Sequence, residues 1–102
     1  MIARTWHGTA ALVKADAYRH HFTTKVAPQL KEIAGHKGAY LLQRQVDGKM
    51  EFLAVTFWDS LETIKKFAGP NPDLATVEPE GRAALLVFDD FAKHYEVAYG
   101  NI

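Results

Sequence analysis

The chain has 102 residues, and its 12 basic and 12 acidic side chains give a formal net charge of zero at pH 7. A protein that binds a nucleic acid backbone needs a basic face, and the zero net charge argues against one, so we expect no nucleic acid partner. Cysteine is absent, which excludes disulfides, thiolate catalysis and cysteine-bound zinc or iron–sulfur centres. The sequence has no signal-peptide pattern and no apolar window of membrane-spanning length, about 18 residues. We therefore expect one cytoplasmic domain over residues 1–102 that does not contact a membrane.

The N-terminal third predicts a strand followed by an interrupted helix. Residues 2–8 are short, compatible with a strand and ended by glycine. From about Ala15 the apolar spacing becomes helical, and Pro28 predicts a kink or a break in that helix. Gly35 is a good residue to end it. The apolar stripe of this helix consists of Tyr18, Phe22, Val26, Leu30 and Ile33.

The middle of the chain predicts a hairpin. Residues 36–46 and 50–58 both alternate as strands do, and Asp47-Gly48 between them is a strong turn signal. The second of these strands is apolar on both faces, so both faces must be covered. Asp59 and Glu62 then predict a capping box, and the helix that they start should stop at Gly69.

The C-terminal third is less regular. Residues 70–81 are rich in proline and predict a loop or isolated helical turns, whereas residues 82–88 fit a strand as well as a helical turn. Residues 93–99 alternate and predict a closing strand. The order is that of an α+β, ferredoxin-like split β-α-β fold with an antiparallel sheet. Because the helices cover only one face of such a sheet, we expect a second copy of the chain to cover the other.

Five segments together resemble the antibiotic biosynthesis monooxygenase domain of the dimeric α/β-barrel superfamily, and the resemblance covers essentially the whole chain. It implies a homodimer whose two sheets form a barrel and, in the members that are enzymes, an apolar pocket between sheet and helices. The segments are W-x-G, I-A-G-x-x-G-A-Y-L-L-x-R, F-W-D-S-L-E-T-I-K-K-F-A-G, P-E-G-R and H-Y-E-V.

The resemblance also implies a chemistry. Members that oxidise polyketide anthrones use no metal or flavin, because the deprotonated substrate donates an electron to O2. Trp58 resembles a residue of these enzymes, whereas Ala54 stands where they have an asparagine. Members that degrade haem have an asparagine on the first strand, a tryptophan where this chain has Phe67, and a histidine shortly after it. No histidine lies between His36 and His94 here, so haem degradation is disfavoured.

Large aromatic side chains are the predicted ligand-binding residues. Trp58 is the first, because its ring at the end of a strand can stack on an aromatic ligand. Tyr18, Phe22 and Phe67 should face the sheet and line the same space, and core packing alone is the alternative for all four. Arg44 is a candidate to hold an anionic substrate, with a surface or interface salt bridge as its alternative.

Histidines supply the candidate catalytic base. His7 and His94 lie on the first and last strands, which are neighbours in this fold, and either one is a candidate to remove a phenolic or α-proton. His20 and His21 both look like surface residues. No spacing of metal ligands is recognisable, so we expect neither a metal nor another cofactor.

Three hypotheses follow for the function. The first is a cofactor-independent monooxygenase that acts on a small aromatic or polyketide-like molecule. The second is a non-catalytic dimeric barrel that binds a ligand or responds to stress, which the missing asparagine favours. The third, a histidine-dependent isomerase or lyase, requires His7 or His94 to open into the pocket.

Overall fold

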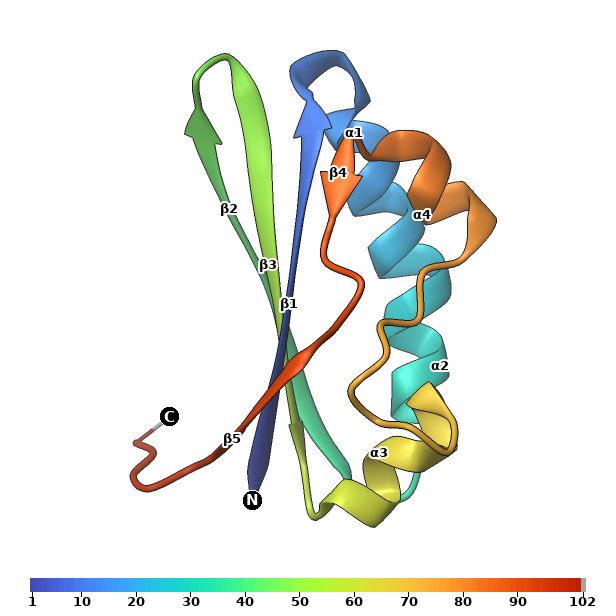
Figure 1. Cartoon of the computed structure of the whole chain (residues 1–102), viewed down its shortest axis with the longest axis vertical. Helices are drawn as coiled ribbons and strands as arrows, with labels where there is room; N and C mark the ends of the chain where they lie inside the picture. The colour runs from blue at the N-terminus through green and yellow to red at the C-terminus, as the bar shows by residue number, and fades with distance from the viewer. Residues whose placement is uncertain (102) are drawn as a thin grey trace.

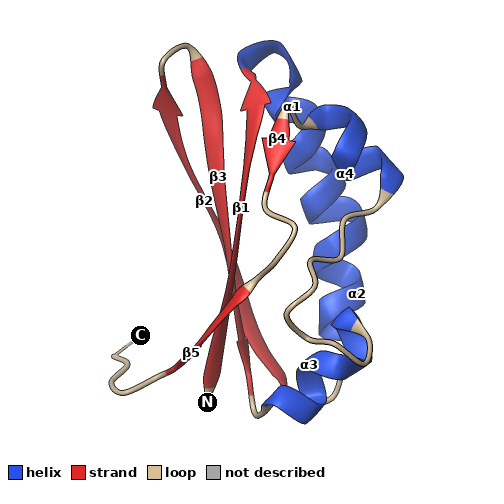
Figure 2. Cartoon of the chain, viewed as in Figure 1, coloured by secondary structure: helices blue, strands red, loops and turns tan. Residues whose placement is uncertain are grey.

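The structure is a computed structural model that describes residues 1–101, and it has two layers (Figure 1). One layer is an antiparallel sheet, and all the helices of the described chain lie on one side of it (Figure 2). The elements are β1 (Ile2–Ala11), α1 (Leu12–His21), the π-helical turn η1 (Phe22–Val26), α2 (Ala27–Lys31), β2 (His36–Val46), β3 (Lys49–Trp58), α3 (Leu61–Ala68), α4 (Pro79–Ala84), β4 (Val87–Phe88) and β5 (Lys93–Glu96).

The sheet has the strand order of a ferredoxin-like fold, which confirms the predicted α+β class. The order is β2-β3-β1-β4, and β5 also pairs with β1. The last strand of the fold is therefore divided into two pieces along one edge of β1. Here β4 lies opposite Gly8 and Thr9, whereas β5 lies opposite residues 2–5.

The first strand is longer than predicted and ends at Ala11 instead of Gly8. Its pairing with β3 continues to Ala11 opposite Lys49, and these backbone hydrogen bonds override the turn preference of glycine. Gly8 is needed for close packing instead. A Cβ atom there would lie 3.0 Å from the Trp6 ring and 3.3 Å from Leu85.

The first helix widens one turn before Pro28 without breaking, since the backbone stays helical between α1 and α2. The N–H of Ala27 donates to the carbonyl of Phe22, five residues back, and closes the π-helical turn η1. Pro28 follows directly after this turn, and because it has no N–H it leaves a carbonyl of the preceding turn without a helical donor. The predicted kink is thus present as a widened turn.

The predicted hairpin is confirmed, but the predicted cap of α3 is wrong. Asp47 and Gly48 both have positive φ angles, 50° and 73°, as a tight hairpin turn requires. The N-cap of α3 is Ser60, whose Oγ accepts a hydrogen bond from the N–H of Thr63 at 3.3 Å. Asp59 instead bonds Gly35 through its backbone N–H and pairs with Lys37.

The segment after α3 is tied to the last strand. The carbonyl of Asp90 accepts a hydrogen bond from the N–H of Ala75 at 2.9 Å, and that of Asp73 accepts one from Ala92 at 2.8 Å. The region left undecided, residues 82–88, divides into the end of α4 and the two-residue strand β4. The closing strand β5 ends at Glu96, earlier than predicted.

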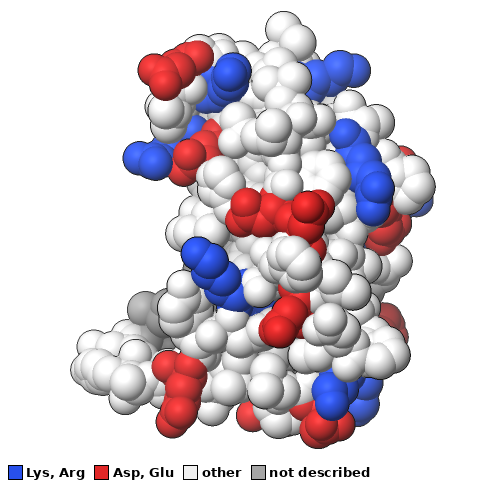
Figure 3. Space-filling view, in the orientation of Figure 1, with Lys and Arg blue, Asp and Glu red and all other residues white. Residues whose placement is uncertain are grey.

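The two faces of the sheet differ. The helix face buries the core, with Phe52, Trp58, Leu30 and Ile64 fully inside. The opposite face, which we call the open face, carries the other apolar side of β3 and half-exposed large side chains such as Leu42 and Tyr95. Charges of both signs alternate over the surface that Figure 3 shows. No helix in residues 1–101 is long and apolar enough to cross a membrane.

Candidate functional site

A cavity lies between the helix face of the sheet and the helices. It measures about 660 Å³ including the open space that it shares with solvent. The short side chain of Ala54 on β3 leaves room for it. The sheet contributes Arg4, Trp6, Ala54 and Thr56; the helices contribute Tyr18, His21, Phe22, Val26, Leu30, Phe67 and Gly81; residues 76–78 complete the lining.

Aromatic rings form much of the cavity wall. Tyr18 lies between Trp6 and Phe52, with ring centroids 6.2 and 4.9 Å away. Burial raises the pKa of the Tyr18 phenol, so it stays protonated at neutral pH. Tyr18, Phe22 and Phe67 thus line one space. That they bind a ligand stays a prediction.

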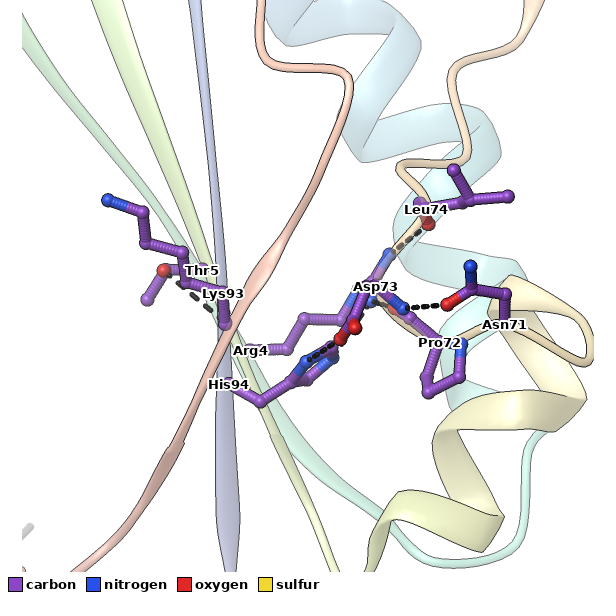
Figure 4. A network of polar contacts seen from close by, with 8 residues as sticks. All are labelled: Arg4, Thr5, Asn71, Pro72, Asp73, Leu74, Lys93 and His94. Carbon is purple, nitrogen blue, oxygen red and sulfur yellow. Dashed lines mark hydrogen bonds and ion pairs between the residues drawn. The ribbon is translucent and has the colours of Figure 1, made fainter.

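Arg4 is a buried cation in the wall formed by the sheet, only 5% exposed. Its guanidinium donates hydrogen bonds to the carbonyl of Pro72 and, at 3.1 Å, to that of Leu74 (Figure 4). Its carbon Cζ also lies 6.0 Å from the centre of the Phe67 ring. Burial lowers the pKa of Arg4 to about 10, and the charge of Asp73 opposes that shift, so the group remains a cation at neutral pH.

His94 contacts Arg4 from β5 instead of lining the cavity. Its Nε2 lies 3.0 Å from Nη1 of Arg4, and its Nδ1 lies 3.3 Å from Oδ1 of Asp73. Because an arginine N–H can only donate, Nε2 must accept, which leaves the proton on Nδ1 to face Asp73. Burial and the Arg4 charge lower the pKa of His94, which favours this neutral form. His94 therefore orients Arg4.

His21 is the histidine that the cavity contains, and the prediction that it lies on the surface is wrong. Its side chain is 6% exposed, because α4 packs over α1 at this point. Nδ1 of His21 lies 3.5 Å from the carboxylate of Glu80 but has no hydrogen-bond partner among residues 1–101. A Cβ atom on Gly81 would lie 3.3 Å from the ring, so glycine permits this close packing.

Trp58 does not line the cavity. It is fully buried behind Thr56 and packs against Leu30, Ile64 and Phe67. Its indole N–H donates to the Thr56 hydroxyl at 2.7 Å. The structure therefore places Trp58 in the core, which was the alternative to its predicted role in binding.

Arg44 and His7 lie on the open face, on the other side of the sheet from the cavity. The side chains of both contact Glu51, with 2.7 Å to Nε of Arg44 and 3.3 Å to Nε2 of His7. The hydrogen bond from Arg44 is the main cause of a lowered pKa for Glu51, and His7 adds to it. Arg44 thus forms the salt bridge that was the alternative to its predicted role, and neither Arg44 nor His7 lines the cavity, although β1 and β5 are neighbours as predicted.

Sequence reasoning missed Arg4, Trp6, His21 and Thr56 as cavity residues. Strand alternation already put Arg4 and Trp6 on one face, and the three-residue spacing from Tyr18 put His21 near its face of the helix. The sequence therefore indicated which residues share a face of a strand or helix. It did not indicate which of these faces borders a cavity.

Comparisons with known proteins bear on the fold. No family model matches the chain, and no curated protein gives a significant match. A crystal structure of a candidate antibiotic biosynthesis monooxygenase from Bacillus cereus superposes with a TM-score of 0.71 at 18% identity, covering 100% of this chain and 95% of that one. The chain has the fold of that protein. The predicted resemblance to these monooxygenase domains is thereby confirmed at the level of the fold.

A second solved structure has the same architecture. It is a mutant of MhuD with two manganese protoporphyrin IX molecules bound per active site, and it superposes with a TM-score of 0.63 at 18% identity. The match covers 99% of this chain and 98% of that one. At this identity the likeness concerns the fold, and the chemistry must be argued from the cavity itself.

Proposed function

We propose that the chain binds a small, flat, oxidisable aromatic molecule in the cavity and oxidises it with O2 without a cofactor. The observation that carries the proposal is the pairing of two polar groups across an aromatic-walled cavity. Arg4 comes from the sheet and His21 from the helices, and both are buried. Buried ionisable groups in an apolar pocket are typical of catalytic sites.

Each group has a role in such an oxidation. His21 accepts the proton of a phenol or anthrone, because imidazole is the side chain suited to proton transfer near neutral pH. The positive charge of Arg4 stabilises the resulting anion in a medium of low polarity. The anion gives one electron to O2, the radical pair combines to a peroxide, and loss of water leaves the quinone. In sum, a CH2 group and O2 become a C=O group and water.

The likeness to a candidate monooxygenase supports this choice of reaction, whereas the residues do not support haem degradation. The first strand has no asparagine, and no histidine lies between His36 and His94. We therefore derive no step through haem. The third hypothesis, an isomerase or lyase, required His7 or His94 to open into the cavity. Neither side chain lines it, so this hypothesis is not supported.

Non-catalytic ligand binding is the second candidate. The observation that favours it is Ala54, which faces the cavity where the resembling enzymes have an asparagine. Both candidates require the same cavity, so turnover is what separates them.

The open face supports a homodimer as part of the proposal. Tyr40, Leu42 and Tyr95 are each about half exposed on it, with values of 48%, 49% and 54%. A second copy of the sheet would cover these side chains and remove their apolar surface from water. Location in the cytoplasm stays a prediction.

Oxygen uptake tests the proposed reaction. Purified protein, treated with a chelator, is given a panel of anthrones, hydroquinones and related phenols, and we expect uptake of one O2 per molecule of quinone formed. Removing a general base costs about 100-fold or more in rate, so His21→Gln should be nearly inactive. His7→Gln is the matched control on the open face and should keep its activity. No uptake by a folded protein that binds the same molecules would favour the non-catalytic candidate.

A further inference from the structure

The charge of Arg4 has no anionic partner in the part of the chain that the structure describes. Its hydrogen bonds go to two carbonyls and to His94, and none of the ion pairs in residues 1–101 includes it. Asp73, whose charge acts on Arg4 from nearby, contacts His94 instead and is 68% exposed. A buried cation that lacks a paired anion is costly to the fold.

Arg4 also has unused hydrogen-bonding capacity. A guanidinium has five N–H groups, and the three contacts occupy two on Nη1 and one on Nη2. The remaining two, on Nε and Nη2, have no partner among residues 1–101. Because Arg4 lines the cavity, a ligand there is the available partner.

The other charged groups at the cavity do not replace this partner. Glu78 lines the cavity and forms no ion pair with Arg4 within the described residues. Glu80 lies beside His21, and its side chain is 68% exposed. The cavity thus has its buried cation on the wall formed by the sheet, with Glu78 in its lining and Glu80 beside His21.

We propose that the cavity takes an arene carboxylate, whose carboxylate pairs with Arg4 while its ring packs against Tyr18 and Phe67. The ligand is thus an anion when it enters, before any proton is removed. His94 contacts one edge of the guanidinium, Asp73 contacts His94 from the other side of its ring, and the rest of the guanidinium is left for the ligand. This inference rests on the proposed function only in the location of the ligand. It does not require the ligand to be oxidised.

Binding of a matched pair of probes tests the inference. The probes are 2-naphthoate and its neutral amide, 2-naphthamide, which share ring and shape, and calorimetry measures both affinities. Charge-assisted hydrogen bonds from Arg4 predict that the wild-type chain binds the acid about tenfold or more tightly. In Arg4→Met the preference should fall to within twofold. Arg44→Met, which removes an arginine from the open face, should keep the wild-type ratio.

Several results would overturn the inference. In the wild-type chain these are equal affinities, a preference for the amide, or no binding of either probe at millimolar concentration. The wild-type ratio needs no variant, so it decides the question even if Arg4→Met does not fold. A carboxylate that binds selectively and is never oxidised would support the inference and count against the oxygenase. Oxidation of neutral phenols, together with equal binding of the acid and the amide, would support the oxygenase and overturn the inference.

Discussion

The hydrogen bond between Trp58 and Thr56 gives a sharp test of the core beneath the cavity. Thr56→Val keeps the shape of the side chain and removes the acceptor, so the indole N–H of Trp58 stays buried without a partner. An unsatisfied buried donor costs about 1–3 kcal/mol. A domain of this size loses roughly 4–8 °C in melting temperature per kcal/mol. We therefore expect a fall of roughly 4–24 °C in thermal denaturation.

A double-mutant cycle isolates that hydrogen bond from other effects of the substitution. Trp58→Phe removes the N–H, so Thr56→Val should cost little when it is added to that variant. The coupling energy should then approach the cost of Thr56→Val alone, about 1–3 kcal/mol. Thr56→Ser, which keeps the hydroxyl, is the control for the changed methyl group. A Thr56→Val protein as stable as wild type, or a coupling energy near zero, would refute the structural role given to Trp58.

Three further predictions concern the turns, the pH dependence and the open face. Gly35→Ala should lower the free energy of unfolding in urea by about 2–4 kcal/mol, because φ is 96° and the added Cβ would lie 2.5 Å from Thr63. Gly48→Ala, which has open space around it, should lower that free energy by about 1 kcal/mol. Equal losses in the two variants would contradict the close contact between Gly35 and Thr63. Burial lowers the pKa of His36 and His94, so the unfolded chain protonates first as pH falls through about 6.5. The melting temperature should therefore drop between pH 7.5 and 5.5, and a rise would oppose the assignment. Sedimentation should give twice 11.4 kDa for the wild-type chain and 11.4 kDa for Leu42→Glu, whereas a wild-type monomer would rule out the dimer.

Features set by neighbouring residues were predictable from sequence. The Asp47-Gly48 turn follows from the residues that tolerate positive φ, and β3 follows from its alternation. The cap of α3 shows that such a prediction can still be wrong by one residue. Asp59 and Ser60 are both good caps, and the hydrogen bond of Asp59 to the distant Gly35 leaves the role to Ser60.

The cavity residues depend on contacts between distant parts of the chain. Arg4 bonds carbonyls that lie 68 and 70 residues further on, so its burial is not visible near it in sequence. His21 looks like a surface residue because α1 carries charged neighbours, and only the packing of α4 encloses it. Trp58 was predicted to bind the ligand because of the chemistry of its ring. Its indole N–H instead donates to Thr56, which lies two residues earlier on the same face of β3.

The position of the bound ligand is the central claim, and intermolecular nuclear Overhauser effects measure it most directly. Unlabelled 2-naphthoate is added to 13C-labelled protein, and contacts from the ligand protons to protein side chains are recorded. We predict contacts to the rings of Tyr18 and Phe67, which line the cavity between helices and sheet. Contacts confined to Leu42 and Tyr40 on the open face would contradict this position of the ligand.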